Sequence, residues 1–148
     1  MTQIALDSST VVTWVLQERR WQVVDALLNT ADSDFVLPGP ALTEIVWIAR
    51  KKGNVSTGDT IAATLRAHGM RVEHCVAADL LRAAELLEIS NKNPGPTNPR
   101  TNLLATLSLG DATILAITER LNCPIVTRDL YWSWLAAQQL IKVRVQTI

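Results

Sequence analysis

Short apolar runs alternate with longer amphipathic segments along the 148 residues of this chain. Residues 3–6, 35–37 and 125–126 are mostly apolar, which is typical of strands that are buried on both faces of a sheet. Residues 70–75 and 141–148 alternate apolar and polar side chains and predict strands with one partly exposed face. Helices are predicted between these strands, over residues 8–16, 21–30, 40–52, 56–68, 77–89, from 108 onward, and over 131–140.

This alternation of strands and helices predicts an α/β fold with right-handed crossovers and helices on both faces of the sheet. We expect a three-layer α/β/α sandwich around a mostly parallel sheet of four to five strands. The chain is long enough for one domain, over residues 1–148, with a substantial core. The polar segment 91–102 holds three of the six prolines and predicts a surface loop, which is too short for a domain linker.

Several apolar side chains are expected in the core because of their spacing or their chemistry. In the helix 21–30 the core positions are Val23, Val24, Leu27 and Leu28. The two cysteines, Cys75 and Cys123, are expected as small core residues. The five tryptophans are expected as anchors of the core or of a subunit interface, although an exposed one could stack on a base.

Composition narrows the setting in which the protein works. Two cysteines allow at most one disulfide and show no metal-site spacing, so a reducing compartment is the simpler interpretation. The first residues lack a basic signal-peptide region, and no apolar run reaches membrane-spanning length. We therefore expect a soluble cytoplasmic protein without a membrane partner. Basic and acidic residues balance at 14 each, so a nucleic-acid partner would need a local basic patch or a metal ion.

Four acidic residues occupy similar places relative to the predicted strands. Asp7 and Asp129 each follow an apolar strand, Asp111 lies in the first turn of a predicted helix, and Glu44 lies in or near the first turn of another. The carboxyl ends of parallel strands, and the helix starts that follow them, lie on the functional edge of an open α/β sheet. The sequence therefore predicts a pocket of four carboxylates.

Each acid also has a structural interpretation. Asp7 can cap the helix that starts at the hydroxyl-rich segment 8–10, the segment 108–111 fits a capping box, and Glu44 suits the positive end of a helix. Four acids in one cleft, however, repel each other unless a cation neutralises them. Carboxylate ligands suit Mg²⁺ or Mn²⁺, whereas zinc would require histidine or cysteine. His68 and His74 do not lie near these acids in the sequence and are expected to be structural or solvent-facing.

Three consecutive basic residues, Arg50, Lys51 and Lys52, end the helix that carries Glu44. They have a structural interpretation as a solvated helix end, where cations favour the helix dipole. Lys51 lies seven residues, or about two turns, after Glu44 and therefore shares its side of the helix. We expect this cluster to contact substrate phosphates.

The ordered set of acidic motifs resembles the PIN-domain ribonucleases, and among them the VapC toxins of type II toxin–antitoxin pairs. The likeness covers nearly the whole chain and is carried by IALD at 4–7, LTEIVWIARKK at 42–52, SLGDATILA at 108–116 and IVTRD at 125–129. The resemblance implies that Asp7, Glu44, Asp111 and Asp129 are the catalytic metal-binding acids. Ser9 and Thr127 match its small hydroxyl positions, which would orient an acid or a water molecule.

The same resemblance implies an activity and partners. It implies an Mg²⁺- or Mn²⁺-dependent endoribonuclease that cleaves RNA of the tRNA or rRNA class, forms a homodimer, and is neutralised by a cognate VapB-type antitoxin. Two features depart from the family pattern. Gly110 stands where relatives often have alanine, and the loop 91–102 is longer than usual.

Three other functions fit parts of the same pattern. A catalytically silent PIN-like module could keep the pocket and act through RNA or protein contact. A response-regulator-like receiver also carries acids at strand ends, but it would have paired acids after the first strand and a lysine after the last. A flavodoxin-like cofactor domain would require a phosphate-binding loop, and no glycine-rich loop of this kind is present.

Overall fold

The computed structural model describes residues 2–99 and 101–148, and in these residues five parallel strands form one sheet. The strand order is β3-β2-β1-β4-β5. The strands are β1 (Thr2–Leu6), β2 (Ser33–Pro38), β3 (Met70–Glu73), β4 (Ile125–Thr127) and β5 (Val145–Thr147). All four pairings are parallel, which confirms the predicted kind of sheet.

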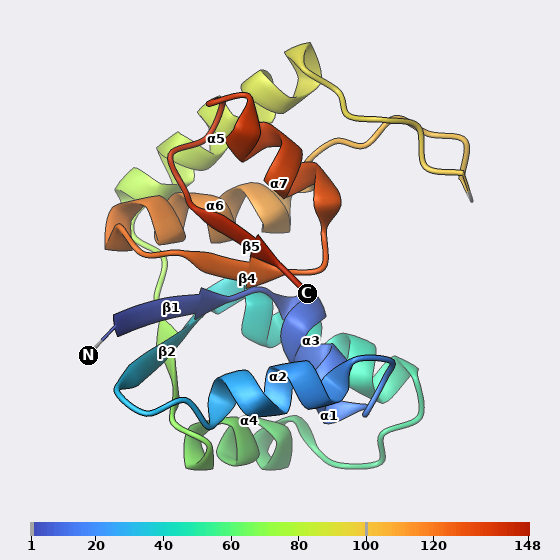
Figure 1. Cartoon of the computed structure of the whole chain (residues 1–148), viewed down its shortest axis with the longest axis vertical. Coiled ribbons are helices and arrows are strands. Elements are labelled where there is room, and N and C mark those ends of the chain that lie inside the picture. Colours follow the sequence, from blue (N-terminus) through green and yellow to red (C-terminus); the bar gives the residue numbers. More distant parts are fainter. Residues whose placement is uncertain (1, 100) are drawn as a thin grey trace.

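Helices cover both faces of this sheet, as predicted (Figure 1). One face carries α1 (Ser8–Val15), α2 (Trp21–Leu28), α3 (Gly39–Lys51) and α4 (Gly58–Ala67). The other carries α5 (Ala77–Lys92), α6 (Leu109–Leu121) and α7 (Leu130–Ala137). Within the described residues, no helix combines the length and the apolar character needed to cross a membrane.

The two central strands explain why the molecule has a separate hydrophobic cluster on each side of the sheet. Successive side chains of a strand point to opposite faces. Ala5 and Ile125 join the cluster under α5, α6 and α7, whereas their neighbours Leu6 and Val126 join the cluster under α1, α3 and α4. All four side chains are fully buried, as expected for strands that are covered on both sides.

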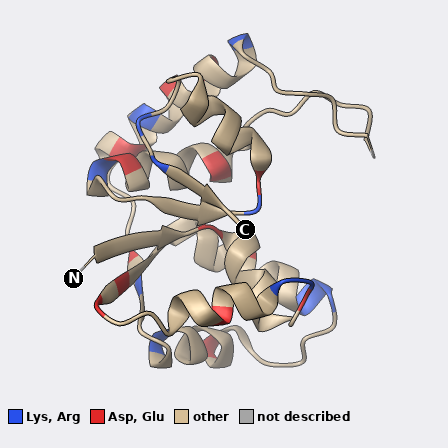
Figure 2. Ribbon diagram, in the orientation of Figure 1, with Lys and Arg blue, Asp and Glu red and all other residues tan. Residues whose placement is uncertain are grey.

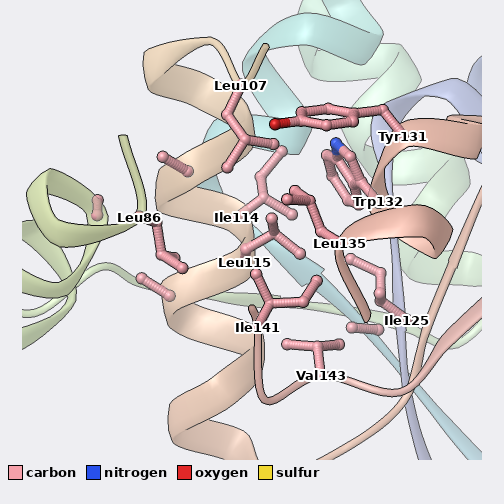
Figure 3. Close-up of a cluster of buried hydrophobic side chains, with 14 of the residues drawn as sticks. Leu86, Leu107, Ile114, Leu115, Ile125, Tyr131, Trp132, Leu135, Ile141 and Val143 are labelled. Atoms are coloured by element: carbon pink, nitrogen blue, oxygen red, sulfur yellow. The ribbon is translucent and has the colours of Figure 1, made fainter. Parts of the chain in front are cut away.

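The cluster on the α5–α7 side is built around α6 and α7 (Figure 3). Trp132 and Leu135 of α7 are fully buried against Ile114 and Leu115 of α6. The indole nitrogen of Trp132 has no hydrogen-bond partner among the described residues and points toward the Tyr131 ring (Figure 3).

The loop between α5 and α6 is anchored at its base. Gly95 is buried against Tyr131, where a side chain on residue 95 would come within 2.5 Å of the ring. The Tyr131 hydroxyl donates to the backbone oxygen of Asn93 at 2.7 Å. Thr97 and Leu104 form an isolated antiparallel bridge farther out. The prediction of a loop is correct, but α5 runs to Lys92 and shortens it at the start.

Other predictions need correction. The last strand comprises only Val145–Thr147, because Ile141 and Val143 are buried in the α5–α7 cluster before the chain reaches the sheet edge. Val23 is 45 % exposed, so it is not a core residue of α2, whereas Val24 is fully buried. Cys75 is exposed and only Cys123 is buried, and both are free thiols.

The strand order also separates the rival folds. Flavodoxin-like and receiver domains have the order 2-1-3-4-5, whereas this sheet has the order 3-2-1-4-5. The chain moves outward from β1 through β2 and β3 and then returns to the other side of β1 with β4. The topological switch point, where ligands bind in open α/β sheets, therefore lies between the carboxyl ends of β1 and β4.

Candidate active site

Asp7 lies at this switch point, directly after β1, and is 4 % exposed. It is the N-cap of α1, and its Oδ1 accepts from the Ser8 backbone N–H at 2.8 Å. Its Oδ2 accepts from the Ser9 hydroxyl at 2.7 Å and from the Thr127 hydroxyl at 2.8 Å. Both predicted hydroxyl residues thus orient the same carboxylate oxygen.

Asp129 is brought to the same edge by the neighbouring strand. Leu6 pairs with Val126, so Asp7 and Thr127 are the next residues of the two strands. Asp129 follows β4 and caps α7, where its Oδ1 accepts from the Tyr131 N–H at 2.9 Å. Its own N–H donates to the Thr127 hydroxyl at 3.0 Å, so Thr127 connects both acids.

Asp111 reaches the site from the first turn of α6. It forms the capping box predicted from the sequence: the Asp111 N–H donates to the Ser108 hydroxyl at 3.1 Å, and the Ser108 N–H donates to Asp111 Oδ2 at 2.9 Å. Residues 112–118 of α6 are buried, so the packing of the helix determines where its first turn lies.

Glu44 lies in the second turn of α3, near the first turn as expected, because the helix begins at Gly39. Its Oε2 accepts from the Ser8 hydroxyl at 2.6 Å. The same hydroxyl lies 3.4 Å from Asp7 Oδ1. Ser8 therefore connects two of the four acids, and its role was not predicted because the sequence offered it only as a hydroxyl at a helix start.

The four acids share one electrostatic property: within residues 2–99 and 101–148, none of them forms an ion pair with lysine or arginine. The acids that do form ion pairs are Glu18, Asp34, Glu73, Asp79, Glu85 and Glu119. Partly buried carboxylates without a counter-charge are costly for a fold, and a bound cation would remove that cost.

Burial and mutual repulsion change the acidity of two of these groups. Burial is the main reason why the pKa of Asp111 is raised from 3.8 to about 6; the charges of Asp7 and Asp129 add to it, whereas hydrogen bonds at the helix start oppose it. Burial also raises the pKa of Asp129, the charge of Asp7 adds to this, and the hydrogen bond from the Tyr131 N–H opposes it.

The chemistry of these donors fits a hard divalent cation, since all four acids offer carboxylate oxygens and neither histidine joins them. In the described part of the chain, however, no three acidic, histidine or cysteine side chains lie close enough together to form a ready-made metal cluster. Each carboxylate is engaged by a hydrogen-bond donor instead, such as Ser8 for Glu44 and Tyr131 for Asp129. A metal ion would therefore compete with these donors.

The predicted basic cluster divides between two surfaces. Lys52 lines a hollow of about 440 Å³ beside the acids, together with Ser9, Glu18, Arg128 and Asp129. Arg50 lines a different hollow with Trp47, and Lys51 is exposed. More generally, basic residues are scattered over the chain and do not form one continuous stripe (Figure 2).

Arg128 was missed in the sequence, although it directly precedes Asp129. Its Nη1 donates to the Thr13 hydroxyl at 2.9 Å and lies 3.3 Å from Glu18 Oε2. Glu18 Oε1 accepts from Lys52 Nζ at 2.6 Å. Only the fold reveals this arrangement, because Glu18 and Lys52 are far from Arg128 in the chain.

The remaining candidates lie outside the site. His68 is exposed, its Nδ1 lies 2.9 Å from the Thr64 backbone oxygen, and its ring meets Trp14 edge-on. His74 is exposed as well. Of the tryptophans, Trp132 is a core residue as predicted, whereas Trp47 is 64 % exposed.

An α/β/α sandwich of this strand order, with acids gathered at its switch point, defines the class of the protein. The family model that matches is the PIN domain, over residues 4–136. The chain therefore belongs to the PIN-domain family, as its motifs suggested. A comparison with curated proteins found no match.

Solved structures share this fold at low sequence identity. VapC20 of Mycobacterium tuberculosis, described as a sarcin-ricin loop cleaving toxin, is 19% identical with a TM-score of 0.70, over 95% of this chain and 98% of its own. A chain of VapBC2 from Rickettsia felis, bound to a promoter DNA fragment, is 12% identical with a TM-score of 0.67 over 99% of both chains. A chain of FitAcB from Neisseria gonorrhoeae is 18% identical, with a TM-score of 0.58 over 96% and 95%.

The unpaired charge at the site predicts how stability responds to neutralising Asp111. Because its pKa is raised when the protein folds, the charged form destabilises the metal-free fold above about pH 6, and stability falls as pH rises from about 4 to 6. Asp111→Asn keeps an oxygen acceptor for the Ser108 N–H and removes the charge. We expect it to raise the free energy of unfolding by about 1–3 kcal/mol at pH 8 in EDTA, and by much less at pH 4.

Asp79 provides a matched control for this experiment. It is also the third residue of its helix and accepts from the Val76 N–H at 2.9 Å, but it faces Arg120 at 2.9 Å. Asp79→Asn should therefore lower stability at pH 8. Urea denaturation of the three proteins at both pH values measures these effects. A loss of stability in Asp111→Asn at pH 8 would contradict the proposed cost of the buried Asp111 charge.

Proposed function

We propose that this PIN-domain protein is a metal-dependent endoribonuclease toxin that hydrolyses RNA phosphodiester bonds and is neutralised by a cognate antitoxin. The observation that supports the proposal is that four carboxylates lie at one edge of the sheet, linked by shared donors and charge effects, without a cationic partner among the described residues. Such a site suits Mg²⁺ or Mn²⁺, which bind carboxylate and phosphate oxygens together.

In this proposal Asp7 and Asp111 are the principal metal ligands, and Glu44 and Asp129 bind directly or through water. A bound divalent ion would lower the pKa of a water molecule and stabilise charge on the leaving oxygen. The protein holds its own groups ready for this chemistry: Ser9 and Thr127 keep Asp7 Oδ2 in place. No covalent intermediate with the protein is required.

The hollow beside the acids offers a path for the RNA backbone. Lys52 and Arg128 both contact Glu18, which keeps two positive charges within reach of Ser9 and Asp129. Phosphates next to the scissile bond would pair with these cations, while the scissile phosphate meets the metal. Arg50 and Lys51 would contribute to longer-range attraction.

Structural similarity supports the class of substrate and of partner. VapC20 is a toxin that cleaves the sarcin-ricin loop, and the Rickettsia felis and Neisseria gonorrhoeae chains come from VapBC and FitAB systems. We propose by analogy a structured RNA of the rRNA or tRNA class as substrate, a VapB-type antitoxin as partner, and a homodimer as the assembled state. The alternative is a catalytically silent module that binds RNA or protein through the same pocket.

The first prediction from this proposal concerns cleavage. Total cellular RNA incubated with the protein and Mg²⁺ or Mn²⁺ should show discrete cuts, mapped by sequencing the ends. Asp7→Asn should lower the rate at least about 100-fold while the fold stays intact, because it removes a charged metal ligand. Asp34→Asn is a matched control, since Asp34 lies near the amino end of β2, away from the switch point.

Chelation by EDTA should abolish the same cuts. Cuts that persist in EDTA, or in Asp7→Asn, would reject the metal mechanism. An absence of cuts with every metal would favour the silent binding module.

The second prediction concerns the basic residues. Lys52→Ala should raise KM for the mapped RNA about fivefold, equivalent to about 1 kcal/mol, with little change in kcat, because Lys52 contacts substrate and not the reacting atoms. Arg50→Ala should change KM less, since Arg50 lines another hollow. Steady-state kinetics at low and high salt measures both effects. Equal changes in the two variants would contradict the proposed path of the RNA.

The third prediction concerns assembly. Size-exclusion chromatography with light scattering should give about twice the 16.3 kDa mass of one chain. The exposed side chains Trp47, Leu80 and Leu81 offer apolar area for such an interface. A monomer at micromolar concentration would reject the homodimer.

A further inference from the structure

Glu44 differs from the other three acids in how its carboxylate is held. Asp7, Asp111 and Asp129 each accept a hydrogen bond from a backbone N–H at a helix start. Glu44 projects from the second turn of α3 and has a longer, more flexible side chain. Among the described residues, the Ser8 hydroxyl is its one hydrogen-bond donor.

The other carboxylate oxygen of Glu44 lies against the first turn of α6. A Cβ atom on Gly110 would lie 2.5 Å from Glu44 Oε1 and 3.7 Å from Glu44 Cδ. Glu44 Oε1 thus occupies the space that a side chain at position 110 would fill. The glycine is not needed for its backbone conformation, since it lies in the first turn of an α-helix, where alanine is favoured over glycine.

Ser8 and Gly110 come from the amino ends of two different helices, α1 and α6. Ser8 contacts one oxygen of the Glu44 carboxylate, and Gly110 lies against the other. The amino ends of both helices carry partial positive charge, which stabilises the negative carboxylate. Ser8 itself is 4 % exposed and is therefore fixed in place. Two rigid elements thus define the position of a side chain that the α3 backbone alone would leave mobile.

We propose that Ser8 and Gly110 are positioning residues for Glu44: Ser8 holds one oxygen by a hydrogen bond, and Gly110 leaves room for the other. A methyl group at position 110 would displace the carboxylate, which can move at low cost because it ends a flexible side chain, and this movement would weaken the Ser8 contact. The packing claim stands on geometry alone, whereas its consequence for metal binding rests on the proposed function.

Thermal unfolding in EDTA tests the packing claim without any need for activity. In a Glu44→Ala background the space is free, so Gly110→Ala should raise Tm by about 1–3 °C through its helix preference. In the wild-type background the same change should give no increase, or a decrease, because the Glu44 contact is lost. Glu44→Gln keeps the shape of the side chain and should behave like the wild type.

Gly58→Ala serves as the matched control. Gly58 also lies in the first turn of a helix, but a Cβ added there would contact Val46 and not Glu44, at 3.2 Å from Val46 Cγ1. Its effect on Tm should be the same with and without Glu44. If Gly110→Ala raises Tm equally in the wild-type and Glu44→Ala backgrounds, the proposed packing is wrong.

Mn²⁺ binding, measured by calorimetry, tests the consequence for the site. Ser8→Ala and Gly110→Ala should each weaken Mn²⁺ binding about tenfold in the wild type, as expected when a partner that orients a ligand is lost. Neither should weaken it further in Glu44→Ala. Equal weakening in both backgrounds would show that they do not act through Glu44.

The Tm measurements in EDTA and the Mn²⁺ measurements distinguish a failure of the packing proposal from a failure of the proposed function. A wild-type protein that binds no Mn²⁺ and cleaves no RNA would defeat the proposed function, while the Tm cycle would still decide the packing of Glu44. A Tm cycle without coupling would defeat the packing claim, while metal-dependent cleavage would still stand.

Discussion

The partial burial of carboxylates without a counter-charge is the constraint on which the rest of this structure depends. Four acids from four separate elements lie at one edge of the sheet, where shared donors and charge effects link them, and no lysine or arginine of the described residues is paired with them. The fold limits the cost by giving each carboxylate a donor, so that hydrogen bonds from Ser8, Ser9, Thr127, Ser108 and Tyr131 partly replace lost hydration. The site is thus stable enough to form and still attractive to a cation.

The comparison of Asp79 with Asp111 shows that the same helix-capping motif can occur in two different electrostatic environments. Both are third residues of a helix and accept from the N-cap backbone. Asp79 faces Arg120 and is neutralised, whereas the neighbours of Asp111 are other acids. A capping signature in the sequence therefore predicts a helix start equally well in both cases, and only the tertiary neighbours decide which acid is available to bind a metal.

Much of the fold could be predicted because it depends on local patterns. The doubly buried strands and the amphipathic helices have distinct periodicities, and the carboxyl ends of parallel strands share one edge, so Asp7 and Asp129 could be placed together from the sequence. Errors arose where tertiary packing decides the position of a side chain. Val23 has core spacing but lies on the outer side of α2, and Ile141 and Val143 alternate like a strand but pack before the sheet edge.

The contributions of Ser8 and Gly110 could not be predicted for a related reason. Each acts on Glu44, which is distant in the chain and lies 36 positions after Ser8. A serine after an aspartate has a sufficient local explanation as a helix start, and a glycine in a first helical turn is simply a weak helix former.

The burial of α6 explains how Asp111 is kept in this unfavourable position. If α6 could slide outward, Asp111 would move away from Asp7 and the cost would disappear. Ile114, Leu115 and Ile117 are fully buried, and together they contribute about 5–9 kcal/mol of hydrophobic free energy, against a cost of about 1–3 kcal/mol for the charged Asp111. Because the hydrophobic free energy exceeds the electrostatic cost, the helix stays in place. The excess negative charge therefore remains at the edge of the sheet, where a cation can neutralise it.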